Sequence, residues 1–228
     1  MPAVEKTLGA RLLRVAQSIP RCETLVDCGC DHGYVSIYAA KNNIAKRITA
    51  SDINRGPLDN AEKTIASAGL CDRIKTVLTD GLDGISRHDC VVIAGMGGEM
   101  IADIIERAPW TKDGSTLVLQ PMTRSEVLRE YLYREGFYIF DESFVREGRH
   151  MYCVISARFS GDITFEPYEK YISRNALGKE LAKEYTDRVL SRLNYELKMK
   201  SDAGKVCEEE KKRYGEDILS LTEMRDKL

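Results

Sequence analysis

Short apolar runs alternate with segments of helical periodicity over the first half of the chain. Five runs have the length and composition of buried strands: residues 24–28, 46–52, 73–79, 90–94 and 115–120. Segments that suit helices lie at residues 34–42, 57–68 and 125–135. One more follows the fourth apolar run and extends to about residue 107. A further helix before the first strand is predicted by the spacing of Leu8, Leu12, Leu13, Ala16 and Ile19. Strands and helices that alternate in this way are typical of βαβ units and predict a parallel sheet.

The alternation of strands and helices ends after Gly136. Residues 137–145 and 151–159 are β-rich, and the link 146–150 between them has no helical pattern, which predicts a hairpin. A dinucleotide-binding sheet would continue with another parallel strand, whereas class I methyltransferases close their sheet with a reversed hairpin. The pattern therefore predicts a doubly wound, mostly parallel α/β sheet of seven strands, within a domain of residues 1–160.

From Glu166 onward the chain is charged, helical in pattern and poor in β-branched residues. One long helix is predicted by apolar residues at a period of about 3.5–4: Tyr171, Leu177, Leu181, Tyr185, Val189 or Leu190, Leu193 and Leu197. Residues 201–204 suit a break, and a second helix is predicted from Lys205 to Leu228. Two such helices form an antiparallel hairpin that resembles a coiled coil, so we expect a small second domain of residues 161–228.

Composition narrows the class of protein. With 228 residues, 43% of them apolar and 31% charged, the chain suits one folded α/β domain with an appendage. No apolar run spans a bilayer and the N-terminus lacks a signal-peptide pattern, so a cytoplasmic protein is expected. Seven cysteines without a C-x-x-C pair favour reduced core thiols over a metal site. A net charge of −2 neither indicates nor excludes binding to nucleic acid.

A glycine-containing loop, D-x-G-x-x-x-G, follows the first strand from Asp27 to Gly33. Its glycines allow a tight turn and close approach of a ligand, and the helix that it opens presents amide donors. The middle glycine of the dinucleotide fingerprint is absent, and Asp31 stands in its place. A carboxylate would repel a pyrophosphate but suits the sulfonium and ammonium of S-adenosylmethionine. The loop therefore favours that cofactor over NAD.

Acidic residues end the next two strands as well. Asp52, followed by Ile53, is placed to accept hydrogen bonds from ribose hydroxyls, and Asp80-Gly81 stands where adenine is usually held. Each acid alone could be a helix cap or a turn residue. Acids at three successive strand ends indicate a nucleoside site.

The fourth strand ends in Ala94-Gly95-Met96-Gly97-Gly98, which we call the lip. Methyltransferases of exocyclic amines commonly carry a D/N-P-P-Y/F motif here, and this chain does not. A glycine-lined lip with one flexible methionine suggests close approach of a planar group. The alternative interpretation is a glycine-rich turn into a helix.

Several motifs together resemble the bacterial tRNA (adenine(22)-N(1))-methyltransferase family, of TrmK type. They are G-x-D-H-x-Y from Gly29 to Tyr34, Asn54-Arg55-Gly56-Pro57, the lip, Leu119-Gln120-Pro121 and the C-terminal helical hairpin, and they cover nearly the whole chain. The resemblance implies tRNA as partner, cofactor binding by the loop and by Asp52 and Asp80-Gly81, and catalysis at the lip. Ser51-Asp52-Ile53 departs from the family's Gly-Glu type pair. Aspartate in place of glutamate keeps the hydrogen-bond acceptor but has a shorter reach. Gly33 replaces an expected alanine.

The predicted site comprises two sets of residues. The cofactor-binding set is Asp27, Gly29, Asp31, His32, Gly33, Asp52, Ile53, Asp80, Gly81, Ala94 and Gly95; the catalytic set is Asp31, Met96 and Gly97. N1 of adenine carries a lone pair, so alignment matters more than a base, and a carboxylate would stabilise the cationic product. Asp31 is the first candidate and Asp27 the second. Tyr34, His32 or Met96 could pack on the flipped adenine.

Two other functions stay open. A methyltransferase for a small molecule or a protein would have a closed acidic or apolar pocket without a basic surface beside it. A catalytically silent scaffold would use its helical hairpin for docking. A tRNA enzyme, expected as a metal-free monomer, should gather basic residues at the lip, and the candidates are Arg11, Arg14, Arg21, Lys41, Arg124 and Arg129.

Overall fold

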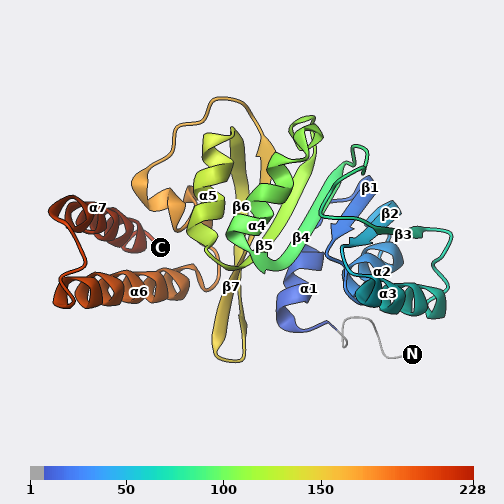
Figure 1. Ribbon diagram of the computed structural model, residues 1–228, viewed down its shortest axis with the longest axis horizontal. Helices are drawn as coiled ribbons and strands as arrows, with labels where there is room; N and C mark the ends of the chain where they lie inside the picture. The colour runs from blue at the N-terminus through green and yellow to red at the C-terminus, as the bar shows by residue number, and fades with distance from the viewer. Residues whose placement is uncertain (1–7) are drawn as a thin grey trace.

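The computed structural model describes residues 8–228 and is organised around a seven-stranded sheet (Figure 1). The strand order is β3-β2-β1-β4-β5-β7-β6, with β7 antiparallel to both of its neighbours and the other pairs parallel. The strands are β1 Cys22–Cys28, β2 Ala45–Asp52, β3 Ile74–Leu78, β4 Cys90–Gly97, β5 Thr116–Thr123, β6 Phe137–Glu147 and β7 His150–Phe159. This is the predicted class I methyltransferase sheet. Residues 1–7 lie outside the described residues, and they include the N-terminal sequence that lacks a signal-peptide pattern.

Helices cover both faces of the sheet. They are α1 Ala10–Gln17, α2 Tyr34–Lys41, α3 Arg55–Ser67, α4 Gly98–Glu106, α5 Ser125–Arg134, α6 Ala182–Asp202 and α7 Glu208–Arg225, with 3-10 turns η2 Pro109–Lys112, η3 Pro167–Lys170 and η4 Arg174–Ala176. Successive residues of a strand point to opposite faces of the sheet: Val26 packs with α4 and α5, and Leu25 packs with α1, α2 and α3. Within residues 8–228, no helix combines the length and the apolar character needed to cross a membrane.

The β6–β7 hairpin is longer than the sequence indicated. Glu147 pairs with His150, so the predicted five-residue link is wrong and the turn is only residues 148–149, where Gly148 has a φ of +59°. The pairing of β7 with β5 ends at Leu119 and Ile155. The rest of the hairpin projects past the carboxyl end of β5, as Figure 1 shows.

The predicted long helix from residue 166 is wrong over its first part. A Pro167 turn with a capping box forms η3, and Leu181 adopts a left-handed φ of +64°, so α6 starts only at Ala182. Helical periodicity gave the wrong prediction here because short turns, and not one helix face, bury Tyr171 and Ile172: η3 packs on α5 and α7, and η4 packs on β6. The predicted break near residues 201–204 and the second helix are present, and α6 and α7 pack side by side (Figure 1).

A buried polar cluster joins the C-terminal segment to the sheet. Arg129 on α5 and Glu142 on β6 form an ion pair with no exposed side-chain surface, and Glu142 also accepts from the amide of Ser173 at 2.7 Å. Burial opposes the charge of Arg129, but Glu142 together with Tyr185 and Cys153 raises the pKa of the guanidinium. Tyr185 of α6 completes the cluster. Because one apolar cluster runs from the sheet into α6 and α7, a domain boundary near residue 160 stays a prediction.

Candidate functional site

Loops that follow the parallel strands meet at the carboxyl edge of the sheet, near the boundary of β1 and β4 where the strand order reverses. A cavity of about 410 Å³ opens there. It is lined by Cys28, Gly29, Ser51, Asp52, Ile53, Asn54, Thr79, Asp80, Gly81, Met96, Met100, Asp103, Ile104 and Arg107. The volume lies within the range of small-molecule sites, roughly 300–1,000 Å³.

The loop after β1 is folded against β2. The amide of Gly29 donates to the carbonyl of Ser51 at 2.8 Å, and Gly29, Asp31 and Gly33 have φ values of +76°, +47° and +71°. Only glycine adopts such angles without steric cost. A Cβ at Gly29 would collide with the methyl group of Met96. The loop therefore keeps a floor without side chains under the cavity.

Asp27 lies beneath this loop rather than in the cavity. Its Oδ2 accepts from the amide of Ser36 at 3.1 Å and from the Ser36 hydroxyl at 2.7 Å, within the first turn of α2. Burial raises the pKa of Asp27 to about 6, although the bonds from Ser36 oppose the shift. Asp27 thus connects the end of β1 to the start of α2 and fixes the loop between them.

Asp52 connects the first two loops. Its Oδ1 accepts from the amide of Asn54 at 2.9 Å and its Oδ2 from the amide of Asp31 at 3.4 Å, while its carboxylate lines the cavity. Ile53 and Met100, 59% and 57% exposed, provide apolar surface in the same lining. Two exposed apolar side chains beside a carboxylate suit a planar ring attached to a hydroxylated sugar.

Residues 94–97 of the lip are the end of β4, and Gly98 begins α4, so the chain passes from strand to helix without an intervening turn. Met96 and Gly97 pair with β5 through a bulge, which extends the strand three residues past its predicted end. The buried Gln120 accepts from the amide of Gly95 at 3.2 Å and from Nη1 of Arg11 at 2.5 Å. Arg11 is therefore held directly beside the lip.

Arg124 stands on the other side of the lip. A Cβ at Gly98 would overlap the backbone of Arg124, whose side chain is exposed and pairs with Glu99 at 3.1 Å. Of the six basic candidates, Arg129 is excluded because it is fully buried, and Arg21 precedes β1 at the opposite edge of the sheet. The lip is flanked by Arg11 and Arg124.

Six of the predicted site residues line the cavity: Gly29, Asp52, Ile53, Asp80, Gly81 and Met96. The structure places Asp27, Asp31, His32, Gly33, Ala94, Gly95 and Gly97 outside the lining. The Asp31 carboxylate is 69% exposed and lies 3.8 Å from His32, whose ring stacks on Tyr34. These three side chains stand on the exposed side of the loop. In the part of the chain from residue 8 onward, no group of three or more His, Cys, Asp or Glu side chains could hold a metal ion.

Sequence reasoning missed the contribution of α4 and its C-terminal cap. Met100, Asp103, Ile104 and Arg107 have the spacing i, i+3, i+4 and i+7, which places them on one helix face, and all four line the cavity. The pattern M-x-x-D-I-x-x-R directly after the lip carries this signal. An apolar and charged face that starts at a ligand-binding loop would have identified them.

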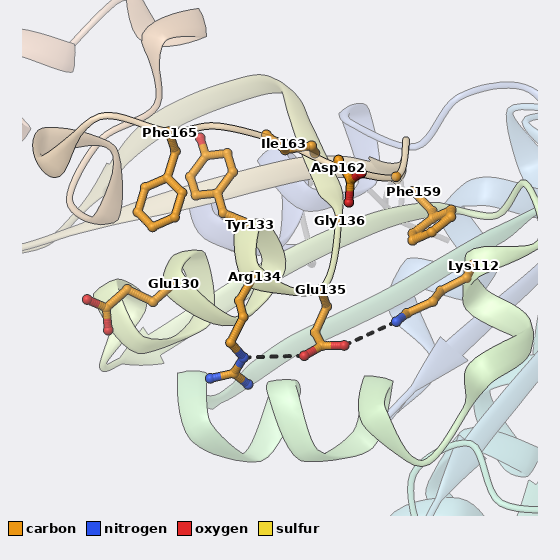
Figure 2. A pocket seen from close by; sticks show the side chains of 11 residues that line it. Lys112, Glu130, Tyr133, Arg134, Glu135, Gly136, Phe159, Asp162, Ile163 and Phe165 are labelled. Carbon is orange, nitrogen blue, oxygen red and sulfur yellow. Dashed lines mark hydrogen bonds and ion pairs between the residues drawn. The ribbon is translucent and has the colours of Figure 1, made fainter.

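A larger hollow of about 660 Å³ lies elsewhere, between the end of α5 and the segment that leaves β7 (Figure 2). Figure 2 shows Tyr133 beside Phe165, with ring centroids 4.9 Å apart, and Glu135 between Arg134 and Lys112. The hollow is at the amino edge of the parallel strands, because Phe159 ends the antiparallel β7. None of the predicted site residues lines it, so we assign the functional site to the smaller cavity.

Known proteins resemble the chain in sequence and in structure. A family model described as a methyltransferase domain matches residues 8–155. The tRNA (adenine(22)-N(1))-methyltransferase of Bacillus subtilis is 36% identical over 161 residues, which cover 69% of this chain and 67% of that protein. The crystal structure of the B. subtilis m1A22 tRNA methyltransferase TrmK has a TM-score of 0.74 and 27% identity, covering 96% of this chain and 99% of that one. M. capricolum TrmK in complex with S-adenosyl-homocysteine has a TM-score of 0.79 and 26% identity, with coverage of 96% and 98%.

Proposed function

The chain belongs to the family of tRNA (adenine(22)-N(1))-methyltransferases, and we propose that it transfers a methyl group from S-adenosylmethionine to N1 of adenine 22 in tRNA. The observation that carries the proposal is the cavity at the carboxyl edge, with a glycine floor and carboxylates from two strand ends. When bound, the cofactor supplies an activated methyl group on a positively charged sulfur.

The cavity suits this cofactor in shape and charge. Asp52 would accept hydrogen bonds from the ribose hydroxyls, and Asp80 with Gly81 would hold the adenine between Ile53 and Met100. The absence of a side chain at Gly29 makes room for Met96, and the loop backbone beside them would border the methionine part. The rest of the proposed cofactor set is Asp27, Asp31, His32, Gly33, Ala94 and Gly95, which shape the loop and the lip around the cavity.

The chain's own residues would align the target base. Met96 contributes to the cavity and belongs to the lip, so its side chain lies between the cofactor site and the substrate side. Gly95 and Gly97 beside it carry no side chains, which allows a flipped adenine to approach edge-on. Asp31 is exposed in the free protein, and a bound tRNA would cover it. Covering a carboxylate strengthens its interaction with the positive charge that develops on the adenine ring.

The surroundings of the lip favour a nucleic acid over a small molecule. Arg11 and Arg124 lie on the two sides of the lip, where phosphates of the nucleotides next to a flipped adenosine would pass. A closed pocket without basic neighbours, as expected for the alternative substrate classes, does not describe this edge. A tRNA substrate implies action in the cytoplasm. We expect the protein to act as a monomer.

Mass spectrometry of nucleosides tests the proposed function. Unmodified tRNA is incubated with the protein and a cofactor that carries an isotopically labelled methyl group, then digested to nucleosides. We expect the label in 1-methyladenosine, and no label when the tRNA carries guanosine at position 22. Label in another nucleoside, or none in any, would contradict the proposal.

A further inference from the structure

One guanidinium holds three carboxylates at the adenine end of the cavity. Arg107, the residue after α4, lies 3.2 Å from Asp80 through Nη2, 2.6 Å from Asp83 through Nη1 and 3.2 Å from Asp103 through Nε. Every nitrogen of the guanidinium therefore has a carboxylate partner. Asp80 uses Oδ1 for this bond.

Arg107 is the basic residue of the cavity lining, which otherwise carries Asp52, Asp80 and Asp103. Its side chain is 32% exposed, less than any of its three partners. Partial burial opposes its charge, but Asp80 and Asp83 outweigh it and raise the pKa of Arg107. The arginine stays charged, and its planar fork restricts the orientation of each carboxylate that it binds.

The backbone next to Asp80 is pressed against the same arginine. Gly81 has a φ of +58°, and a Cβ there would lie 3.0 Å from Ile104 and 3.2 Å from Nη2 of Arg107. A side chain at position 81 would therefore crowd Ile104 and Arg107, so the loop after β3 packs closely on this end of α4.

We propose that Arg107 is a positioning residue that makes the cofactor site selective for adenine. By holding Oδ1 of Asp80, it fixes Oδ2 as an acceptor for the exocyclic amine of the cofactor's adenine. A 6-oxo purine places a carbonyl oxygen at that position, and two acceptors that face each other repel. A fixed carboxylate cannot rotate away from this clash, whereas a released one can. The inference rests on the proposed cofactor site.

Calorimetry with two ligands tests this role. S-Adenosylhomocysteine and its 6-oxo analogue S-inosylhomocysteine are titrated into the full-length protein and into Arg107→Ala. We expect the wild type to prefer the adenosyl ligand at least tenfold and Arg107→Ala to lower this preference at least threefold. If Arg107 had a purely structural role, Arg107→Ala would weaken the binding of both ligands equally and leave the ratio of their dissociation constants unchanged. The matched control is Arg87→Ala, an exposed arginine that pairs with Asp89 and Asp113 at the opposite edge of the sheet.

A second background shows whether Arg107 acts through Asp80. In Asp80→Ala, the further change Arg107→Ala should leave the preference as it is. A continued loss in that background would overturn the positioning role, because the arginine would then contact the base directly. Arg107→Lys serves if the alanine variant does not fold, since one ammonium cannot bind three carboxylates and the preference should still fall. An unchanged ratio in Arg107→Lys would also overturn the inference. Failure of the wild type to bind S-adenosylhomocysteine would instead refute the proposed function.

Discussion

At the scale of single residues, the acids at the strand ends serve two different purposes. Asp52 and Asp80 line the cavity, while Asp27 is buried beneath it and bonds to α2. Sequence position could predict all three, because a residue that follows a parallel strand is placed at the carboxyl edge by the strand itself. It could not separate the two purposes, because burial depends on how the helices pack above each loop.

Replacing Asp27 by Asn tests its burial. The folded-state pKa is raised from 3.8 to about 6, so the folded protein binds the proton more tightly, and this stabilisation is present below pH 4 and lost as pH rises through 6. From pH 4 to pH 7, the wild type should therefore lose on the order of 3 kcal/mol of unfolding free energy relative to the Asp27→Asn variant. Urea denaturation at both pH values measures it. A difference that is independent of pH would show that Asp27 has an ordinary pKa.

Removing the Asp52 carboxylate tests the ribose contact. Asp52→Ala should weaken binding of S-adenosylhomocysteine by about 1–3 kcal/mol, because the ribose hydroxyls lose a charged acceptor. Calorimetry at pH 7 gives the dissociation constants. Asp59→Ala is the matched control, since Asp59 pairs with Arg55 on α3 and does not line the cavity. Equal affinities of wild type and Asp52→Ala would remove Asp52 from the site.

The role of Asp31 can be separated from cofactor binding. Asp31→Asn is nearly isosteric and should lower the single-turnover rate about tenfold at saturating cofactor and tRNA, equivalent to about 1.4 kcal/mol. Saturation hides any loss of affinity, so the rate reports only the methyl-transfer step. A wild-type rate would leave Asp31 as a residue of the loop without a catalytic role.

At the scale of elements, the largest difference between expectation and structure is the segment between β7 and α6. Its apolar residues follow a helical period, but Tyr171, Ile172 and Ala176 are buried by separate short turns, of which η3 packs on α5 and α7 and η4 on β6. Local periodicity cannot tell one helix face from several insertions into a core formed by distant strands. The sheet itself could be predicted, because strand runs, turn residues and the hairpin are all local patterns. The residues of the α4 face form a local pattern after the lip, but only packing determines that this face borders the cavity.

Truncation distinguishes a separate domain from a shared core. A protein ending at residue 165 loses Ser173 and Tyr185, the partners of the buried Arg129–Glu142 pair. We expect a lower melting temperature and loss of cooperative unfolding, because a buried ion pair deprived of its hydrogen-bond partners is costly. Thermal denaturation followed by circular dichroism measures this. Unchanged melting together with unchanged affinity for S-adenosylhomocysteine would show that the sheet folds independently of the C-terminal helices and would support the domain boundary near residue 160.

At the scale of the whole molecule, the cavity, the lip and the projecting hairpin share the carboxyl edge of the sheet. The net charge of −2 gives no sign of a nucleic-acid partner, so the basic contribution must be local. Arg11 is held by Gln120 and its guanidinium lies 5.7 Å from the ring centre of Tyr152 on the hairpin, which positions one cation at the lip. Such placement depends on the assembled fold, and the sequence alone could only nominate candidates.

Neutralising Arg124 tests the proposed tRNA path. Arg124→Gln should weaken tRNA binding and reduce the slope of log affinity against log salt by about 1, as for the loss of one phosphate contact. Affinity for S-adenosylhomocysteine should not change. Filter binding at several salt concentrations measures the slope, and Arg87→Gln at the opposite edge is the control. An unchanged slope would place the tRNA elsewhere.

The most direct test of the proposed function is to locate the methyl group in the tRNA. A methyl on N1 blocks Watson–Crick pairing of adenine, so reverse transcription of the treated tRNA should stop directly before position 22, after nucleotide 23 has been copied. We predict a stop that requires both the protein and S-adenosylmethionine, that disappears in tRNA with guanosine at position 22, and that weakens for Asp52→Ala at limiting cofactor. A stop at another position, or full-length transcripts throughout, would contradict the account.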